Sequence, residues 1–204
     1  EGQGCCGALH AHAGRLDGAR QLARRNIELF ERLAPDYLAV NSAGCGAAMK
    51  HYDRLLAHDP EWAEAARRFS GRVRDVHELL EELGWEKPPS SDRVLTYHDA
   101  CHLAHGQGVT AAPRAIMASL GRLVELPKAD RCCGSAGTYN LTQPETAAQL
   151  LEDKVDQIES TGAEVVGVAN PGCLLQIRHG LRMRGSRVRA EHPMVLLAEA
   201  YGRT

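Results

Sequence analysis

The sequence predicts an α/β fold made of two tandem repeats, each a small parallel sheet covered by helices. Two observations support this prediction: the chain resembles itself at a nearly constant offset, and each copy alternates short apolar strands with amphipathic helices. The chain has 204 residues, which suffices for two small domains, and its 44% of hydrophobic residues allow a packed core.

The repeat begins at two cysteine pairs. Cys5-Cys6-Gly7 aligns with Cys132-Cys133-Gly134, and after a one-residue gap the register holds at an offset of 128 residues. A shared period of this length indicates a duplicated structural unit. The matching positions include Ala19 and Ala147, Val40 and Val168, Gly44 and Gly172, and Cys45 and Cys173.

Each copy continues from its Cys-Cys-Gly turn into an amphipathic helix and a short apolar strand at 37–40 or 165–168. The second helix is expected to begin near Thr142-Gln-Pro-Glu145, which has the spacing of a capping box, and to end at Gly162. The apolar stripes are Leu16, Ala19, Ala23, Ile27 and Phe30 in copy one, and Ala147, Leu151, Val155 and Ile158 in copy two.

A long helix is expected between the copies, opened by Asp59-Pro60-Glu61 and closed by Gly84. Residues 87–92 contain two prolines and read as a linker, followed by a strand at 94–97, a helix at 113–120 and a strand at 123–126. We therefore predict two cysteine-rich domains, at residues 1–87 and 93–204.

The cysteines lie where a parallel sheet places its ligand site. Cys45, Cys101 and Cys173 each follow a predicted strand, and ligands bind beyond the carboxyl ends of such strands. The first four residues are neither basic nor apolar, so we expect no signal peptide and a reducing compartment, where cysteines act as ligands or thiols rather than disulfides. The candidate metal ligands are Cys5, Cys6, Cys45, Cys101, Cys132, Cys133 and Cys173.

Three interpretations of these cysteines stay open on spacing alone. Iron–sulfur clusters are held by Cys thiolates, and adjacent cysteines can ligate separate irons of one cluster. A structural zinc site usually has Cys-x2–4-Cys pairs, which this sequence lacks. The third interpretation is thiol–disulfide chemistry, or a catalytic thiol, at Cys132-Cys133, or cysteines that are simply buried and inert.

Other features narrow the class of protein. A formal charge of −2 and 4% aromatic residues argue against nucleic-acid binding, and no apolar run approaches the roughly 20 residues that span a bilayer.

The acidic residues form no paired arrangement, so no catalytic residue is assigned. His98 and His102 flank Cys101 and could bond a cluster sulfur or bind metal directly, although most histidines in such a position are satisfied by hydrogen bonds within the turn. Five arginines between 178 and 189 could dock a partner subunit or anionic lipid, although most such runs are solvated.

Five stretches together resemble the cysteine-rich CCG domain of heterodisulfide reductase subunits, lactate-utilisation proteins and glycolate oxidase iron–sulfur subunits. Their residues are most similar to those of the last group. The similarity itself covers nearly the whole chain. The five stretches are Gly4-Cys-Cys-Gly-Ala-Leu-His10, Ser42-Ala-Gly-Cys-Gly46, Tyr97-His-Asp-Ala-Cys-His102, Arg131-Cys-Cys-Gly-Ser-Ala-Gly-Thr-Tyr-Asn140 and Ala169-Asn-Pro-Gly-Cys173.

The resemblance implies an electron-transfer subunit with a [4Fe–4S]-type cluster. Partner subunits carrying FAD would oxidise glycolate to glyoxylate, and the clusters would pass electrons toward a quinone-type acceptor. It implies a cytoplasmic protein, with contact at the inner face of the membrane as a further expectation. A lactate-utilisation or heterodisulfide-reductase-like protein, and a non-redox zinc module, are the alternatives.

The sequence departs from this pattern at two points. The reductase motif ends in Cys-x-x-Cys, whereas Cys173 is followed by Leu174-Leu175-Gln176, so the fifth thiolate is absent. Copy one has no leading cysteine and the chain has no initiator Met, so we expect a longer native polypeptide with ferredoxin-type cysteine runs before Glu1.

Overall fold

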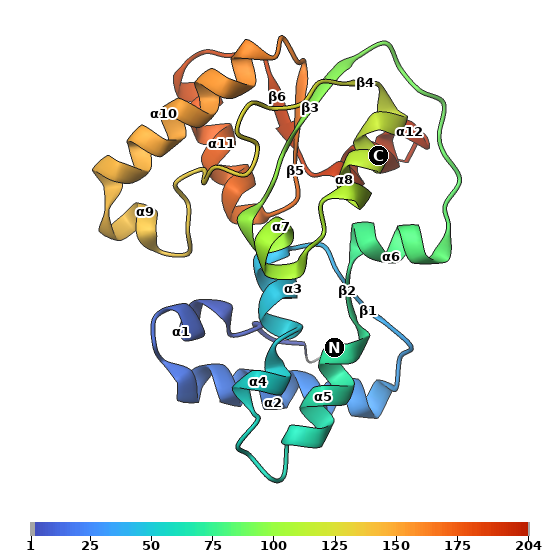
Figure 1. The fold of residues 1–204 in the computed structure, drawn as a ribbon, viewed down its shortest axis with the longest axis vertical. Helices are drawn as coiled ribbons and strands as arrows, with labels where there is room; N and C mark the ends of the chain where they lie inside the picture. The colour runs from blue at the N-terminus through green and yellow to red at the C-terminus, as the bar shows by residue number, and fades with distance from the viewer. Residues whose placement is uncertain (1–2, 204) are drawn as a thin grey trace. The chain divides into compact units, whose positions relative to one another are not determined.

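The computed structural model describes residues 3–203 and separates into two compact units, which we call unit 1 (Glu1–Leu79) and unit 2 (Leu80–Thr204). Both units contain a small parallel sheet flanked by helices, which confirms the predicted fold class (Figure 1). Residues 1, 2 and 204, at the outer ends of the two predicted domains, lie outside the described residues.

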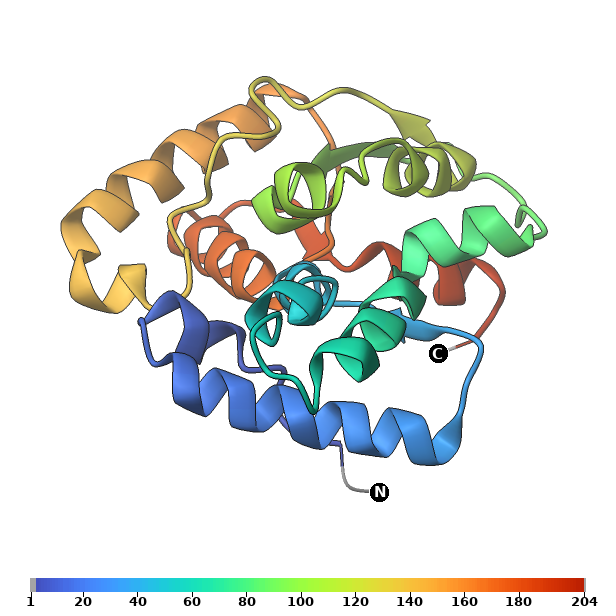
Figure 2. The ribbon, with the colours of Figure 1, turned by 60° about the horizontal axis from the view of Figure 1, so that its bottom comes forward.

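Unit 1 places a two-stranded parallel sheet beside a group of helices. β1 and β2 pair with Leu38 opposite Val73, and α1 folds back along the longer α2, as Figure 2 shows. The elements are α1 (Ala8–His12), α2 (Leu16–Leu33), β1 (Leu38–Val40), α3 (Ala43–Met49), α4 (Tyr52–Leu55), α5 (Ala63–Arg72), β2 (Val73–Asp75) and α6 (Val76–Leu83), which crosses the division between the units.

The core of unit 1 lies between α2, α4 and α5. Ala19, Ala23, Ile27 and Phe30 of the predicted stripe are buried, but Leu16 at the start of α2 is 43% exposed, so the prediction was wrong there. The ring of Phe69 lies 5.3 Å from Phe30, edge to face, and 5.1 Å from Tyr52, stacked. These three rings bury a large apolar area at the centre of the unit.

The long helix expected from Asp59 to Gly84 is interrupted, which corrects the sequence prediction. α5 ends at Arg72, and Val73–Asp75 form β2 before α6 begins. The reason is tertiary, because this segment pairs with β1 and buries Val73 and Asp75 completely. Sheet pairing therefore overrides the helical tendency of the flanking sequence.

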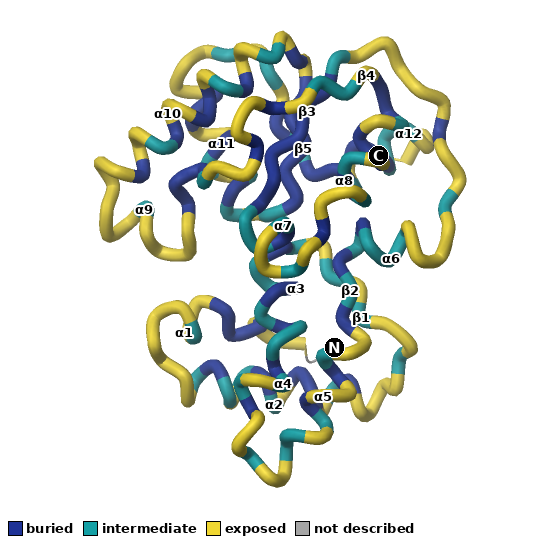
Figure 3. The backbone as a smooth tube through the Cα atoms, in the orientation of Figure 1, coloured by how far each residue is buried: buried dark blue, intermediate teal, exposed yellow. Residues whose placement is uncertain are grey.

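Unit 2 has a four-stranded parallel sheet in the order β4-β3-β5-β6. In Figure 3 its central strands are coloured as buried, and all four residues of β5 are buried. The elements are β3 (Val94–His98), α7 (Cys101–Gln107), α8 (Ala111–Leu120), β4 (Arg122–Leu123), α9 (Tyr139–Thr142), α10 (Pro144–Ser160), β5 (Val165–Val168), α11 (Pro171–Met183), β6 (Arg189–Glu191) and α12 (Pro193–Ala200).

Two local predictions for unit 2 were wrong in detail. The N-cap position of α10 is Gln143 and carries no side-chain cap, because the Thr142 hydroxyl bonds carbonyls of the preceding short helix α9 instead. The strand expected at 123–126 is the two-residue β4, shifted to Arg122–Leu123. The predicted stripe of α10 is confirmed, with Ala147, Leu151, Val155 and Ile158 all buried.

The repeat relates β1 and β2 of unit 1 to β5 and β6 of unit 2, because both pairs are parallel neighbours in the same order. The strands β3 and β4 have no counterpart among the described residues of unit 1. Residues 84–93 form neither helix nor strand, which includes the segment predicted as a linker.

Candidate metal centre

Three loops at the carboxyl edge of the unit 2 sheet carry its cysteines. Cys101 is the first residue of α7, directly after β3, and Cys173 lies in the first turn of α11, after β5. Cys132 and Cys133 lie in the loop between β4 and α9. The edge predicted from strand order is therefore the edge where the structure gathers these residues.

The most compact group of ligand atoms at this edge belongs to His98, Cys133 and Cys173. One ligand atom from each lies within 4.8 Å of the other two, and the residues are 1%, 1% and 5% exposed. Cys101 and Cys132 are half-buried. The structure thus groups Cys133 and Cys173 with a histidine at a buried site, and the half-buried Cys101 and Cys132 lie close enough to interact with it.

A glycine turn after each cysteine pair explains why the repeat preserves Cys-Cys-Gly. Gly134 has φ +88°, and a Cβ there would lie 2.5 Å from the carbonyl oxygen of Ala147. Gly7 has φ +80° and its Cβ would lie 3.3 Å from Ala19, the matching position in copy one. The turn therefore needs both the left-handed backbone and the missing side chain, because the loop lies directly on the following helix.

The thiols of unit 2 affect one another's pKa values. The pKa of Cys173 is lowered by the thiol of Cys133, which donates a hydrogen bond to it, and Asn170 Nδ2 donates another at 3.5 Å. The hydrogen bond with Cys132 lowers the pKa of Cys133, whereas the hydrogen bond to Cys173 and burial raise it. The two raising effects together are larger, so the pKa of Cys133 is raised to about 12. Burial raises the pKa of Cys101, and the nearby charge of Cys132 adds to this rise. Without a cation, the site therefore favours one ionised thiol over several. A bound cation would compensate the negative charge of further thiolates.

Lys154 is a charged residue at this site that the sequence analysis did not single out. It lies on the buried face of α10, is 0% exposed, and donates from Nζ to the carbonyl of Lys128 at 2.9 Å. Burial lowers its pKa to about 8, against the opposing charges of Cys133 and Asp130. The sequence could have indicated this residue, because Lys154 lies between Leu151 and Val155 and interrupts the apolar stripe of the helix.

Unit 1 holds its three cysteines differently. The Cys6 thiol donates to Cys45 Sγ at 3.1 Å, and this bond lowers the pKa of Cys45 to about 6 while raising that of Cys6. Cys5 is exposed, and its Sγ accepts from the backbone N–H of Gly7 at 3.4 Å. Cys132 accepts from Gly134 in the same way at 3.3 Å, so the turn is shared although the thiol environment is not.

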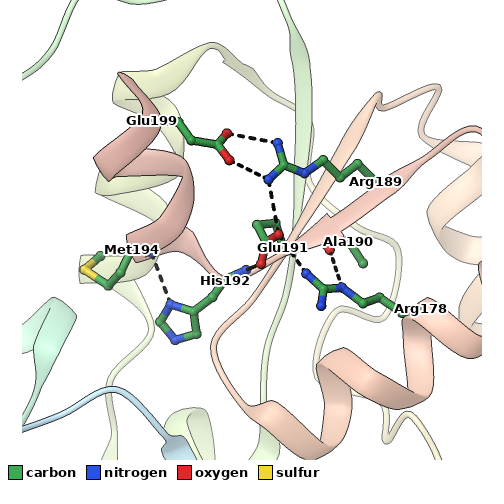
Figure 4. Close-up of polar contacts among 7 residues, drawn as sticks. All are labelled: Arg178, Arg189, Ala190, Glu191, His192, Met194 and Glu199. Carbon is green, nitrogen blue, oxygen red and sulfur yellow. Dashed lines mark hydrogen bonds and ion pairs between the residues drawn. The ribbon is translucent and has the colours of Figure 1, made fainter. Parts of the chain in front are cut away.

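The arginine run near the C-terminus is largely paired within unit 2 (Figure 4). Arg178 binds the Ala190 carbonyl at 2.9 Å and Glu191 at 2.7 Å. Arg189 bridges Glu191 and Glu199, as the dashed lines in Figure 4 show. These contacts tie α11 and α12 to β6, which leaves less free positive charge for docking than the sequence suggested.

Comparison with known proteins adds independent information. The cysteine-rich CCG domain family matches residues 1–50 and 95–178. The chain is 40% identical over 98% of its length to a probable glycolate oxidase iron–sulfur subunit of Bacillus subtilis, and 35% identical over 83% to the glycolate oxidase iron–sulfur subunit of Escherichia coli. It covers 47% and 43% of these two relatives, so it spans about half of their length.

A third relative is matched over most of its length. The lactate utilization protein A of Exiguobacterium is 31% identical over 97% of this chain, which in turn covers 82% of that protein. Among the described residues, no helix is long and apolar enough to cross a membrane. The shared cysteine pairs, the repeat and these matches together place the chain in the cysteine-rich CCG domain family.

Proposed function

We propose that this chain is an iron–sulfur electron-transfer component of a complex that oxidises a 2-hydroxy acid, with glycolate as the substrate. The observation that supports it best is the convergence of Cys101, Cys132, Cys133 and Cys173 on one edge of the unit 2 sheet. The relatives named as glycolate oxidase iron–sulfur subunits support the choice of complex.

The donor set fits such a cluster. Four thiols, two buried and two half-buried, can supply four thiolate ligands, and adjacent Cys132 and Cys133 can reach different irons of a [4Fe–4S]-type cluster. When bound, such a cluster accepts and passes on one electron at a time. The half-buried side chains of Cys101 and Cys132 would leave one side of the site close to the surface, where a redox partner can approach.

The surrounding residues would hold and tune the thiolates. The amide of Asn170 and the backbone N–H of Gly134 donate to Cys173 and Cys132, and hydrogen bonds to sulfur stabilise negative charge there. The buried Lys154 would add a positive charge beside Cys133. Burial of Cys133 and Cys173 would exclude water from this side of the site.

The rest of the proposal concerns partners. FAD-containing subunits would take two electrons and two protons from glycolate to give glyoxylate, and this chain would pass the electrons toward a quinone-type acceptor. We place it in the cytoplasm, with contact at the inner face of the membrane. L-lactate is the second substrate candidate, supported by the lactate utilization relatives. We also propose that residues 1–87 and 93–204 are the two cysteine-rich domains.

A structural zinc site is the second candidate function. It is favoured by the three ligand atoms of His98, Cys133 and Cys173 lying within 4.8 Å of one another, because one tetrahedral ion needs such a group. Zinc protein would be colourless and free of sulfide. A thiol–disulfide enzyme at Cys132-Cys133 would instead consume disulfide without metal.

The test is anaerobic reconstitution of the full chain with iron and sulfide. We expect comparable amounts of both, broad visible absorption, and a loss of both in Cys132→Ser, Cys133→Ser and Cys173→Ser. Binding of zinc alone, with no sulfide retained, would contradict the electron-transfer proposal. For the substrate, the complete complex should reduce dye with glycolate faster than with L-lactate, and the reverse order would move the assignment to lactate.

A further inference from the structure

His98 carries a buried ring nitrogen that the fold leaves without a hydrogen bond. The residue is 1% exposed, and its Nδ1 has no partner among the residues that the structure describes. An unsatisfied buried polar atom costs about 1–3 kcal/mol, so a histidine kept for packing alone is expected to bond both ring nitrogens or to be replaced by an apolar residue. The fold therefore leaves one buried ring nitrogen of His98 without a partner.

The ring is aimed at the thiols. A ring nitrogen of His98 lies within 4.8 Å of the Sγ atoms of both Cys133 and Cys173. The three residues come from the end of β3, the loop after β4 and the first turn of α11, so the grouping is made by the tertiary fold and not by neighbours in sequence.

The backbone around His98 is held by strand pairing and by hydrogen bonds of the protein itself. His98 is the last residue of β3 and pairs with Val168 of β5. The next residue, Asp99, donates its N–H to the Ala129 carbonyl at 3.1 Å, and its carboxylate binds Arg114 through two bonds of 2.7 and 2.8 Å. A site residue held in this way needs little reorganisation to act as a ligand.

The sequence around the site leaves room for a histidine ligand. The sequence supplies no thiolate in the turn after Cys173, where Leu174-Leu175-Gln176 follow, so the site has a place for a ligand of another kind.

We propose that His98 is a protein ligand of the unit 2 metal centre, acting beside Cys133 and Cys173. The identification of that centre as an iron–sulfur cluster rests on the function proposed above, but the ligation by histidine does not depend on which metal is bound. A neutral imidazole carries one negative charge fewer than the fifth thiolate of the reductase motif, so the reduction potential of a cluster held by the four cysteines and His98 would be higher than with five thiolates.

The first experiment uses the full chain reconstituted with iron and sulfide, unlabelled and labelled with ¹⁵N-histidine. Pulsed electron paramagnetic resonance of the reduced sample should show a nitrogen coupling that changes isotope with the label. The coupling should be lost in His98→Leu and kept in His105→Ala, an exposed histidine of α7. Full iron and sulfide with no histidine coupling would overturn the ligand while leaving the proposed function standing.

The second experiment uses Co²⁺ alone as a probe of the same full chain. Its ligand-field absorption should shift between the wild-type chain and His98→Leu, and the Leu variant should bind Co²⁺ at least about tenfold more weakly. Equal spectra and equal affinity would overturn the proposal. A histidine-dependent Co²⁺ spectrum in a chain that takes up no iron and sulfide would support the ligand and contradict the cluster.

A third measurement separates a ligand from a residue that merely fills the core. In the metal-free chain, His98→Leu should unfold at about the same free energy as the wild-type chain, because it removes an unsatisfied nitrogen together with the ring's one hydrogen bond to the Ala129 backbone. His98→Asn, which keeps a polar group there, should not gain stability. A metal-free Leu variant that fails to fold would overturn the proposal, since it would show that the ring is needed by the fold itself.

Discussion

The two units share a turn and differ in what surrounds it. In both, a left-handed glycine follows the cysteine pair, its N–H bonds the first sulfur, and the loop lies on the long helix that follows, at Ala19 or Ala147. In unit 1 the second cysteine, Cys6, bonds only one other thiol, Cys45. In unit 2 the second cysteine, Cys133, meets Cys132, Cys173 and the His98 ring.

The long helix on which the cysteine turn lies, α2 in unit 1 and α10 in unit 2, also differs between the units. Asn26 of α2 donates to the Cys5 carbonyl and to the Tyr52 hydroxyl, and that hydroxyl donates to the Cys6 carbonyl at 2.6 Å. At the repeat position of Asn26, unit 2 has the buried Lys154, and at that of Tyr52 it has Gly180. Unit 1 fixes its cysteine loop with neutral hydrogen bonds, whereas unit 2 places a cation beside its thiols.

The same Cys-Cys-Gly motif therefore lies in two different electrostatic environments. The motif determines the turn, and the sheet and helix around it determine how many ligands meet there. Unit 2 has β3, which brings His98 and Cys101 to the site, and the described part of unit 1 has no such strand. We therefore expect the metal retained by the chain alone to depend on unit 2.

The sharpest test compares matching cysteines. Cys173→Ser should remove most of the bound metal, a larger loss than the roughly 10- to 100-fold fall in affinity that follows removal of an outer-shell partner. Cys45→Ser, at the matching position of unit 1, should leave the metal content close to that of the wild-type chain. Metal analysis of both variants after anaerobic reconstitution decides this, and equal losses would contradict the comparison.

The second test concerns the aromatic core of unit 1. Phe69→Ala removes the ring that contacts both Phe30 and Tyr52, and should lower the free energy of unfolding of unit 1 by about 3–5 kcal/mol. The metal at unit 2 should remain, because the two units are separately compact. Denaturant unfolding followed together with metal absorbance measures both, and loss of the metal at native-like conditions would show that the units are not independent.

The third test uses the buried lysine. Burial lowers the pKa of Lys154 from 10.5 to about 8, so between these values the unfolded chain binds more protons than the folded one. The contribution of Lys154 to the free energy of unfolding of the metal-free chain should therefore rise with pH across this window, by an amount on the order of 1–3 kcal/mol.

Lys154→Met should abolish this rise, and Lys87→Met, an exposed lysine, should retain it. Titrating cysteines are common to all three proteins, so the difference between variants isolates the lysine. A Met variant with the full wild-type slope would contradict the assignment of a strained buried cation.

The smallest effect is expected at the helix that follows β6. His192 Nδ1 accepts from the N–H of Met194 and caps α12, as Figure 4 shows. Asp75 caps α6 in the same way by accepting from the N–H of His77. His192→Ala should cost about 1 kcal/mol in the free energy of unfolding, whereas His192→Asn should cost less, because asparagine is a good N-cap residue. Thermal unfolding measures both, and equal costs would argue against a capping role.

Sequence alone determined the repeat, the α/β class, the buried stripe of α10 and the strand at 165–168. These features depend on local periodicity and on turn residues such as Gly134, whose conformation the neighbouring sequence already requires. Sequence also placed the cysteines at the carboxyl edge of the sheet, because strand order implies that edge.

Tertiary structure decided the rest. Pairing with β1 turned residues 73–75 into a strand where the flanking sequence favoured helix, because burial of Val73 and Asp75 in the sheet outweighs local propensity. The fold also chose which of the two histidines flanking Cys101 faces Cys133 and Cys173, and it buried Lys154 beside them. These outcomes depend on contacts between segments that are separated by about 20 to 75 residues in the chain. Such contacts cannot be predicted from a local sequence pattern.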